Sequence, residues 1–146
     1  MSASGIDISR RPHRVAVVAL LDSANLPTDD LSDEHLEHFF YLGARSAPFG
    51  LVGLELCGTD ALLRSLVVAP ENRVSGSGSA LVACAEDYAR MHGIGSMYLL
   101  TTTAEAFFAH RGYARIERED APDSIRSTRE YSGICPATSA LMVKHL

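Results

Sequence analysis

The sequence has few cysteines, and their arrangement excludes two common structural roles. The 146 residues include three, Cys57, Cys84 and Cys135, an odd number at wide spacing. Neither a secreted disulfide framework nor a C-x-x-C zinc site is therefore expected, and we predict buried thiols in a reducing cytoplasm. His35 and His38 lie three residues apart, but no third ligand accompanies them, so no metal site is expected.

Long apolar runs and clusters of positive charge are also missing. No apolar stretch reaches the roughly 18 residues that a membrane-spanning helix needs. The first residues, MSASGIDISRRPHR, have no apolar segment before their charges, as a signal peptide would. The net charge is -5 and Lys and Arg form no continuous face, so neither a membrane nor a nucleic acid is expected as a partner. With 47% hydrophobic and 21% charged residues, the chain is predicted to form one globular domain over residues 1–146.

Periodic patterns predict an α/β fold with a mixed, mostly antiparallel sheet. Apolar residues at helical spacing predict helices at residues 12–25, 32–38, 79–92, 103–112 and 121–132. Runs rich in β-forming residues predict strands at residues 5–9, 39–44, 50–57, 62–68, 96–101, 113–119 and 138–146. The short connections SAPFG and GTD indicate an antiparallel meander in the first half. The central sheet should therefore have about six to seven strands flanked by helices.

The stretch RVSGSG, residues 73–78, places glycines between an apolar strand and an amphipathic helix. Such a turn is typical of a phosphate-binding loop, because glycine permits close backbone approach and the N–H groups at a helix start face the anion. A P-loop is excluded because no lysine follows Gly78. A dinucleotide fingerprint is weak because leucine occupies the third glycine position. The pattern that remains is R/Q-x-x-G-x-G/A after a strand ending V-x-P, and it is satisfied by Val68, Pro70, Arg73, Gly76 and Gly78.

With this pattern, the chain resembles the GCN5-related N-acetyltransferases (the GNAT superfamily) over nearly all of its length. The resemblance implies a GNAT fold, acetyl-CoA as co-substrate and no metal. It also implies that the strand before the loop pairs with the pantetheine and that the loop amides hold the pyrophosphate. The expected acetyl-CoA contacts are Leu66, Val67, Val68, Arg73, Val74, Ser75, Gly76, Ser77, Gly78 and Ser79. Val74 and Ser75 depart from the commoner R-G-x-G-x-G form, which has a glycine and often a basic residue at those places.

Acetyl transfer to an amine needs a base for the amine and benefits from an acid for the leaving thiolate. Glu55 is the candidate base, because it is one carboxylate among apolar residues in GLVGLELCG; the alternative is a solvent-facing glutamate beside a turn. The superfamily often has a tyrosine acid in an F-Y pair, but here the pair is Phe107–Phe108, so that acid is missing. Thr101 stands where asparagine is often found. Either another group protonates the thiolate or it leaves unaided, because a free thiol has a pKa of about 8.5.

Arg64 is a single cation in the apolar run LLRSLVV. It is expected either to hold a substrate carboxylate through two hydrogen bonds or to point to solvent. Ser65 should face the opposite side of the strand unless a β-bulge intervenes.

A closer resemblance, to the bacterial arsenic-resistance N-acetyltransferases, rests on LPTDDL, ALLRSLVV, LLTTTAEAFFAHRGY and IRSTREYSGICPATSALMVKHL. These enzymes are similar in turn to the acetyltransferase domain of N-acetylglutamate synthases. Both resemblances imply an acceptor with an α-amine and an α-carboxylate, namely glutamate or a toxic analogue such as arsinothricin or phosphinothricin. The residues expected to contact it are Arg64, Thr101, Arg126, Thr128 and Arg129. The alternative for Arg126 and Arg129 is an exposed helix face.

Two other functions are compatible with the sequence. A cationic acceptor, such as a polyamine or an aminoglycoside, is favoured by the net charge and by the acidic residues Asp29, Asp30, Asp33, Glu34 and Glu37. A CoA-binding sensor without catalysis is favoured by the missing tyrosine and the altered loop. Turnover on a panel of amines separates these hypotheses, and the sequence leaves a homodimer open.

Overall fold

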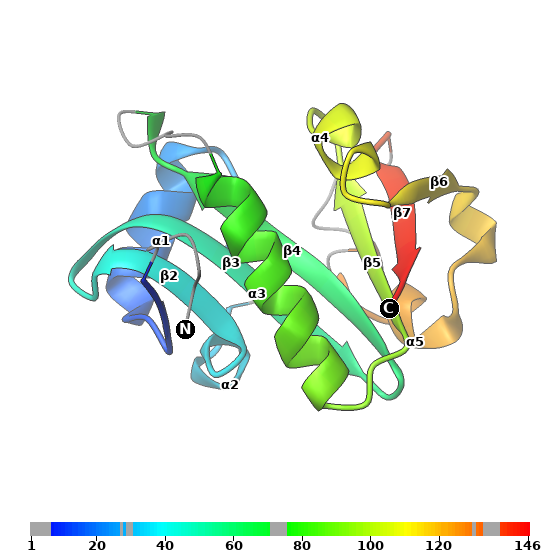
Figure 1. The fold of residues 1–146 in the computed structure, drawn as a ribbon, viewed down its shortest axis with the longest axis horizontal. Helices are drawn as coiled ribbons and strands as arrows, with labels where there is room; N and C mark the ends of the chain where they lie inside the picture. Colours follow the sequence, from blue (N-terminus) through cyan, green and yellow to red (C-terminus); the bar gives the residue numbers. More distant parts are fainter. Residues whose placement is uncertain (1–6, 27, 29–30, 71–75, 130, 133–137) are drawn as a thin grey trace.

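Seven strands form the sheet that organises the protein, in the order β1-β2-β3-β4-β5-β7-β6 (Figure 1). The computed structural model describes residues 7–26, 28, 31–70, 76–129, 131–132 and 138–146. The strands are β1 (Ile8–Arg10), β2 (Phe39–Ala44), β3 (Ala47–Cys57), β4 (Asp60–Val68), β5 (Ser96–Thr101), β6 (Ala114–Ile116) and β7 (Ala140–His145). Each overlaps one of the predicted β-rich runs, because those runs carry the apolar residues that the sheet buries.

The sheet is antiparallel except at one junction. β1 to β4 form an antiparallel meander, and β7 pairs antiparallel with both β5 and β6. β4 and β5 are parallel, so the chain must cross over between them, and it does so through a helix. The prediction of an α/β fold with a mixed, mostly antiparallel sheet is confirmed.

Helices cover both faces of the sheet (Figure 1). Their bounds are α1 (Arg14–Ser23), α2 (Asp33–Leu36), α3 (Ser77–Met91), α4 (Glu105–Ala109) and α5 (Asp123–Arg126). α3 packs on one face through Leu81, Ala85 and Ala89, which recur every four residues and so share one side of the helix. α1 and α2 pack on the opposite face.

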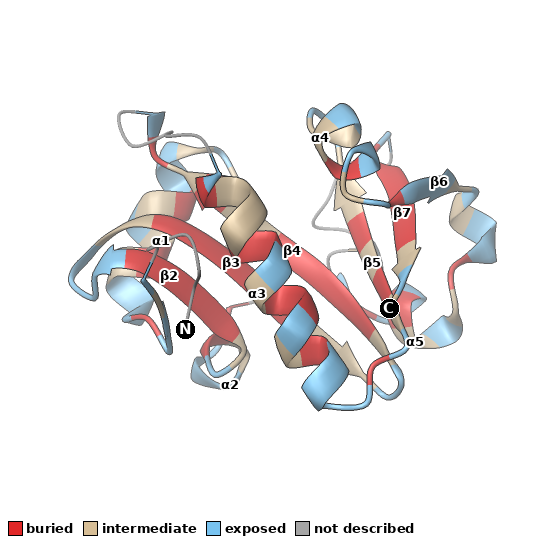
Figure 2. Cartoon of the chain, in the orientation of Figure 1, coloured by how far each residue is buried: buried red, intermediate tan, exposed pale blue. Residues whose placement is uncertain are grey.

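β2 shows how the sheet is buried on both sides. Its first four residues are all buried. Phe40 and Leu42 join the apolar cluster under α3, whereas Phe39 and Tyr41 join the cluster under α1 and α2. Because side chains alternate between the faces of a strand, a continuous apolar run is what a strand covered on both faces requires. Figure 2 shows the same pattern as buried strands beneath helices whose outer surfaces are exposed.

The Phe39 ring lies so close to the backbone of β3 that position 53 must be glycine. A Cβ added at Gly53 would lie 2.3 Å from Cζ of Phe39, far inside van der Waals contact. The Phe39 ring therefore lies flat against the backbone of β3, and only glycine leaves room for it.

A β-bulge interrupts the pairing of β3 with β4. Gly53 is opposite Arg64, whereas Leu51 is opposite Val67, so β4 contains one extra residue in this interval. Ser65 accommodates the extra residue with a φ of 60°, a left-handed conformation that is uncommon outside glycine. The bulge predicted as a condition for Arg64 and Ser65 to act together is therefore present.

β4 and β5 are paired over their first halves. Their pairs run from Asp60–Ser96 to Leu63–Leu99. β4 continues to Val68 and β5 to Thr101, beyond the last of these pairs. The two strands therefore part toward their carboxyl ends.

Two predicted elements in the second half are shorter than expected. The strand predicted at 113–119 gives way to a 3₁₀ turn, η2, at Arg118–Asp120. The helix predicted at 121–132 forms α5 over its early part, is interrupted at Ser127 and Thr128, and is helical again at residues 129, 131 and 132. The Ser127 hydroxyl donates to the Asp123 carbonyl over 2.8 Å. The backbone N–H of Ser127 donates to the same carbonyl over 3.0 Å, so this residue closes the last turn of α5.

Candidate active site

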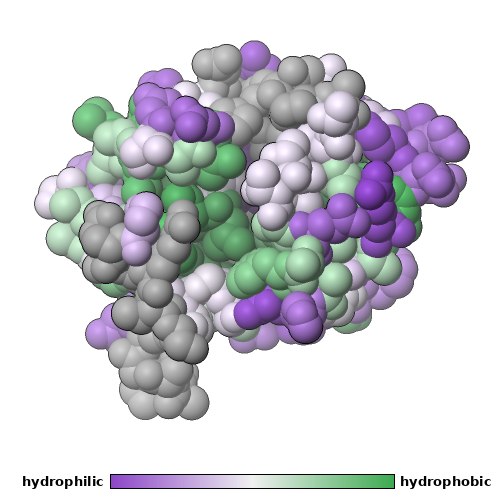
Figure 3. Space-filling model, turned by 90° about the horizontal axis from the view of Figure 1, so that it is seen from above, coloured by the Kyte–Doolittle hydropathy of each residue, from purple (hydrophilic) through white to green (hydrophobic). Residues whose placement is uncertain are grey.

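The parting of β4 and β5 leaves a cleft of about 530 Å³ beside the start of α3. The lining residues come from the end of α1, the second half of β4, the first turn of α3 and the β5–α4 connection: Ala24, Leu26, Leu66, Val67, Val68, Ser77, Gly78, Thr103, Ala104 and Phe107. Figure 3 views this end of the molecule and shows apolar surface gathered beside a hollow. A mostly apolar lining with a helix N-terminus at its edge suits a ligand that has an apolar arm and an anionic group.

The start of α3 is shaped by two glycines. Gly76, just before the helix, has a φ of 94°, and a Cβ added to it would meet no described atom within 4 Å. At Gly78 a Cβ would lie 3.3 Å from Cζ of Phe107. The first N–H groups of a helix have no acceptor within it, so this turn presents donors and the positive end of the helix dipole.

The structure brings many of the predicted acetyl-CoA contacts together. Leu66, Val67, Val68, Ser77 and Gly78 line the cleft, as the sequence predicted for an arm beside β4 and an anion at the helix start. Ser79 lines a neighbouring pocket on the other side of the same helical turn. The predicted contacts Arg73, Val74 and Ser75 lie outside the described residues.

Glu55 and Arg64 form an ion pair under the α1–α2 layer. Arg64 Nη1 lies 2.8 Å from Glu55 Oε2, and the Arg64 side chain is fully buried. Arg64 Nε also donates to Ser65 Oγ over 3.1 Å, a contact that the bulge permits. Of the two alternatives for Arg64, pointing to solvent is wrong, because its side chain is buried and paired with Glu55. Pairing is the expected outcome, because a buried guanidinium without a counter-charge is costly.

His35 extends this pair, and sequence reasoning missed it. Its Nε2 lies 3.9 Å from Glu55 Oε1. Its Nδ1 accepts from the Ser32 backbone N–H over 3.2 Å. An accepting Nδ1 in a neutral ring places the proton on Nε2, which faces Glu55. The signal was local, since Ser32 and His35 form a capping box at the start of α2.

The ion pair lies where the two parallel strands begin to part. Leu63 is the last residue of β4 that pairs with β5, and Arg64 follows it. Glu55 shares the sheet face of Leu51, which packs under α1 and α2. The pair is therefore on the face opposite α3, at the closed end of the strand opening.

The tyrosine acid of the superfamily is replaced in the Phe107–Phe108 pair. The two phenylalanines lie in different places. Phe108 is buried in the core, with its ring centroid 5.5 Å from that of Tyr113. Phe107 lines the cleft. Thr101 ends β5, and its Oγ1 accepts from the Ala104 N–H over 3.0 Å. Thr101 therefore shapes the turn that leads into α4.

The predicted acceptor contacts near α5 are held by partners in their own segment. Arg126 is exposed and pairs with Asp123 at 2.7 Å. This hydrogen bond raises the pKa of Arg126, with the charge of Asp123 adding to it. Thr128 is buried, and its hydroxyl donates to the Ile125 carbonyl over 2.7 Å. Arg129 is exposed.

Cys57 follows the ion pair along β3 and is a weakly acidic thiol. Burial raises its pKa to about 11, and the negative charges of Glu55 and Asp60 act in the same direction. A neutral thiol is a poor nucleophile and a poor ligand for soft metals. Cys84 has its pKa raised by burial as well, and Cys135 lies outside the described residues.

Two other kinds of site are absent from the described part of the chain. No group of three or more His, Cys, Asp or Glu side chains there could hold a metal ion. None of its helices is long and apolar enough to cross a membrane.

The chain is similar to several known acetyltransferases. It is 25% identical over 143 residues to an amino-acid acetyltransferase of Neisseria meningitidis serogroup A, an alignment that covers 92% of this chain and 31% of that protein. N-acetylglutamate synthase from Neisseria gonorrhoeae, solved with coenzyme A and N-acetyl-glutamate, superposes with a TM-score of 0.77 at 22% identity and covers 96% of this chain and 35% of that one. A Mycobacterium tuberculosis protein solved with CoA and the ligand NLQ gives a TM-score of 0.75 at 20% identity, covering 96% and 99%.

The fold and the cleft define an α/β domain of the acetyltransferase class. Residues 8–116 match the acetyltransferase (GNAT) family, and the chain belongs to that family. It spans about a third of the length of the amino-acid acetyltransferases that it matches.

Proposed function

We propose that this protein is an acetyl-CoA-dependent N-acetyltransferase that acts on a small amino-acid-like amine, with residues 1–146 as one catalytic domain. The observation that carries the proposal is the cleft between the parting strands β4 and β5, edged by the start of α3. Its apolar wall suits the pantetheine arm and the acetyl group. The donors at the first turn of α3 suit the pyrophosphate.

The reaction joins the acceptor nitrogen to the acetyl carbon and breaks the carbon–sulfur bond of the thioester. The acceptor arrives as an ammonium ion and must lose a proton before it attacks. The electron pair of the broken bond leaves with the sulfur as a thiolate, which takes up a proton to become the CoA thiol. The protein has to hold both reactants in line and provide a place for the departing proton.

Glu55 is proposed as the group that receives the proton from the ammonium, directly or through water. Arg64 fixes one carboxylate oxygen at 2.8 Å, and His35 lies 3.9 Å from the other. The hydrogen bond from Arg64 gives this base a defined orientation.

Thr101 is proposed to donate a hydrogen bond to the carbonyl oxygen of the thioester. Its oxygen already accepts from the Ala104 N–H, so its own O–H is directed elsewhere. From the end of β5 it can donate to the thioester carbonyl as negative charge develops there. Phe108, where the superfamily often has a tyrosine acid, cannot donate a proton, so either another group protonates the thiolate or it leaves unaided.

An acceptor with a carboxylate is supported by charge and by similarity. Arg129 is an exposed cation in the second half of the chain, and Arg64 stays a proposed contact whose charge is shared with Glu55. The similarity to a Neisseria amino-acid acetyltransferase points the same way. Within this class we propose glutamate or a toxic analogue such as arsinothricin or phosphinothricin, the acceptors of arsenic-resistance enzymes.

The test is release of CoA thiol with a panel of amines at saturating acetyl-CoA. Glutamate, phosphinothricin and arsinothricin represent acidic amino acids, and spermidine and an aminoglycoside represent cationic amines. Turnover confined to the acidic members is the expected result. Turnover confined to the cationic members would overturn the acceptor class but not the reaction. Acetyl-CoA binding without turnover on any amine would favour a sensor.

Arg129 gives a matched test of the carboxylate contact. Arg129→Ala should raise the KM for the acidic acceptor about tenfold or more, as for a lost charge-assisted hydrogen bond, while the affinity for acetyl-CoA stays unchanged. Arg115→Ala is the control, because Arg115 is an exposed arginine that pairs with Glu105. An unchanged KM in Arg129→Ala would remove this residue from the acceptor site.

A further inference from the structure

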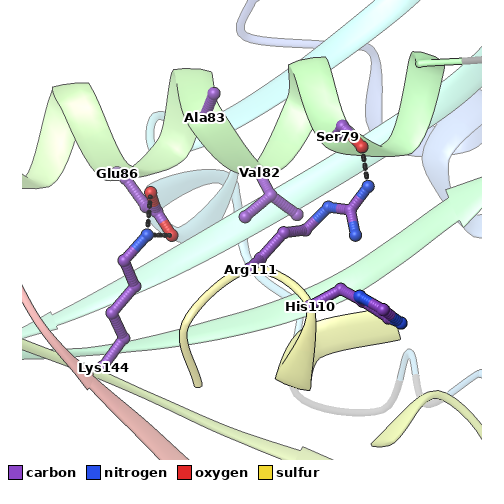
Figure 4. Close-up of a pocket in the computed structure, with 7 residues that line it drawn as sticks. All are labelled: Ser79, Val82, Ala83, Glu86, His110, Arg111 and Lys144. Carbon is purple, nitrogen blue, oxygen red and sulfur yellow. Dashed lines mark hydrogen bonds and ion pairs between the residues drawn. The ribbon is translucent and has the colours of Figure 1, made fainter. Parts of the chain in front are cut away.

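A second pocket lies on the other side of the first turn of α3. It has a volume of about 580 Å³ and is formed by one side of α3, the end of α4 and β7. Figure 4 shows Arg111 reaching from the end of α4 toward Ser79, with Lys144 and Glu86 joined further along the helix. This pocket shares no lining residue with the cleft between β4 and β5, here called the acyl cleft. None of the proposed acceptor contacts lines it.

The charges in the pocket do not balance. Lys144 Nζ lies 3.0 and 3.2 Å from the two oxygens of Glu86. Tyr113 donates a further hydrogen bond to Glu86 over 2.9 Å. The one carboxylate is thus fully engaged by its own lysine and tyrosine. Arg111 forms no ion pair with any carboxylate in the part of the chain that the structure describes.

Arg111 is held rigidly against the helix start. Its Nη2 donates to Ser79 Oγ, its Nη1 donates to the Phe107 carbonyl over 3.0 Å, and its guanidinium stacks on the Phe107 ring at 3.8 Å. Its Nε is buried without a hydrogen-bond partner among the described residues. The positive charge of Arg111 lies beside the start of α3, where the helix dipole is also positive. The two positive charges repel each other, and an anion bound between them would be attracted by both.

The pocket and the acyl cleft are adjacent parts of one path. Gly78 and Phe107 line the cleft, whereas the pocket is lined by Ser79, the next residue of α3, and by Arg111, which follows the end of α4 and stacks on Phe107. A ligand that crosses the start of α3 therefore passes from one to the other. In CoA, the pantetheine is followed by the pyrophosphate and then by adenosine with a phosphate on its ribose 3′ oxygen.

We propose that Arg111 binds the ribose 3′-phosphate of acetyl-CoA, that exposed His110 assists it, and that this pocket holds the nucleoside end. The inference rests on acetyl-CoA being the co-substrate, as proposed above. The volume suits a nucleoside-sized group, and a guanidinium presents the forked donors that match a phosphate. Arg111 thus makes the protein select CoA over its 3′-dephospho form.

The experiment compares the Kd of CoA with that of 3′-dephospho-CoA by calorimetry, so that it needs no acceptor. We expect the intact protein to prefer CoA by about tenfold or more, equal to about 1.4 kcal/mol. In Arg111→Gln, which keeps N–H donors for Ser79 and Phe107, the preference should fall to within about twofold. Arg111→Lys should be intermediate, because it keeps the charge but not the fork. Arg115→Ala should keep the full preference.

Each other outcome overturns the assignment. An intact protein with equal affinity for both ligands would overturn it without any variant. Equal losses for both ligands in folded Arg111→Gln would make Arg111 a brace between α3 and α4 or a pyrophosphate contact. Absence of CoA binding to the intact protein is a different failure, because it would contradict the proposed function itself.

Discussion

At the scale of single residues, the Glu55–Arg64 pair shows what a sequence reveals and what it conceals. Each residue stands out as a charge in an apolar strand, so both could be singled out. Their pairing depends on the register of two strands and on a bulge at Ser65. Serine with a φ of 60° has no distinctive sequence signal, so the bulge and the contact could not be predicted.

Glu55→Gln should lower kcat strongly with little change in acetyl-CoA affinity, because the variant cannot accept a proton. It also leaves the buried Arg64 without its counter-charge, so the free energy of unfolding should fall by about 3 kcal/mol or more. Stopped assays across pH, with thermal unfolding and calorimetry on the same sample, separate the two effects. Glu105→Gln, at an exposed pair with Arg115, is the control. A folded Glu55→Gln variant with unchanged kcat at every pH would eliminate Glu55 as the base.

Gly76→Ala should weaken acetyl-CoA binding at least about tenfold. A non-glycine residue at a φ of 94° is strained by about 1 to 2 kcal/mol, so the turn that leads into α3 should shift. Its Cβ would also occupy open space where the pyrophosphate is proposed to lie. Calorimetry gives the affinity, and circular dichroism verifies the fold. Gly93→Ala is a matched control, since Gly93 also has positive φ but lies at the other end of α3. Equal CoA affinity in the intact and Gly76→Ala proteins would contradict the anion site.

At the scale of elements, local signals were predictive and long-range ones were not. The start of α2 was predicted from Ser32, because a capping box involves neighbouring residues alone. The central strands were predicted because their apolar runs are long. The short β6 and the interruption of the helix after α5 were missed, since packing decides them. The opening between β4 and β5 is a property of two strands distant in sequence, so it was not predicted.

Gly53→Ala should destabilise the packing of Phe39 of β2 against β3. The added Cβ would lie 2.3 Å from Phe39 Cζ, so the ring must move, at a cost of about 1 to 3 kcal/mol. The melting temperature should fall by roughly 5 to 10 °C. Gly95→Ala is the control, because its Cβ would meet only one described atom, at 3.9 Å. If crowding is the cause, Phe39→Leu combined with Gly53→Ala should cost less than the sum of the two single changes.

At the scale of the whole molecule, alkaline pH should weaken the fold. Burial raises the pKa of Cys57 to about 11 and raises the pKa values of Cys84, Tyr98 and Tyr113 as well. The folded state therefore keeps protons that the unfolded chain releases, and stability falls as pH rises from about 9. Urea unfolding between pH 8 and 11 measures this slope. Cys57→Ala should make the slope shallower between about pH 9 and 11, and an unchanged slope would remove Cys57 as a cause.

The junction between β4 and β5 is also a seam between two halves of the chain. β1 to β4 and α1 to α3 precede it, while β5 to β7, α4 and α5 follow it. The halves share four residue pairs in the sheet and are joined through a short connection at Gly93–Gly95. A break there would give two fragments, each with its own set of antiparallel strands. Acetyl-CoA in the proposed cleft would touch both, so it would hold the fragments together. The two fragments would also share the core under α3, so acyl-CoA should strengthen an association that packing already favours.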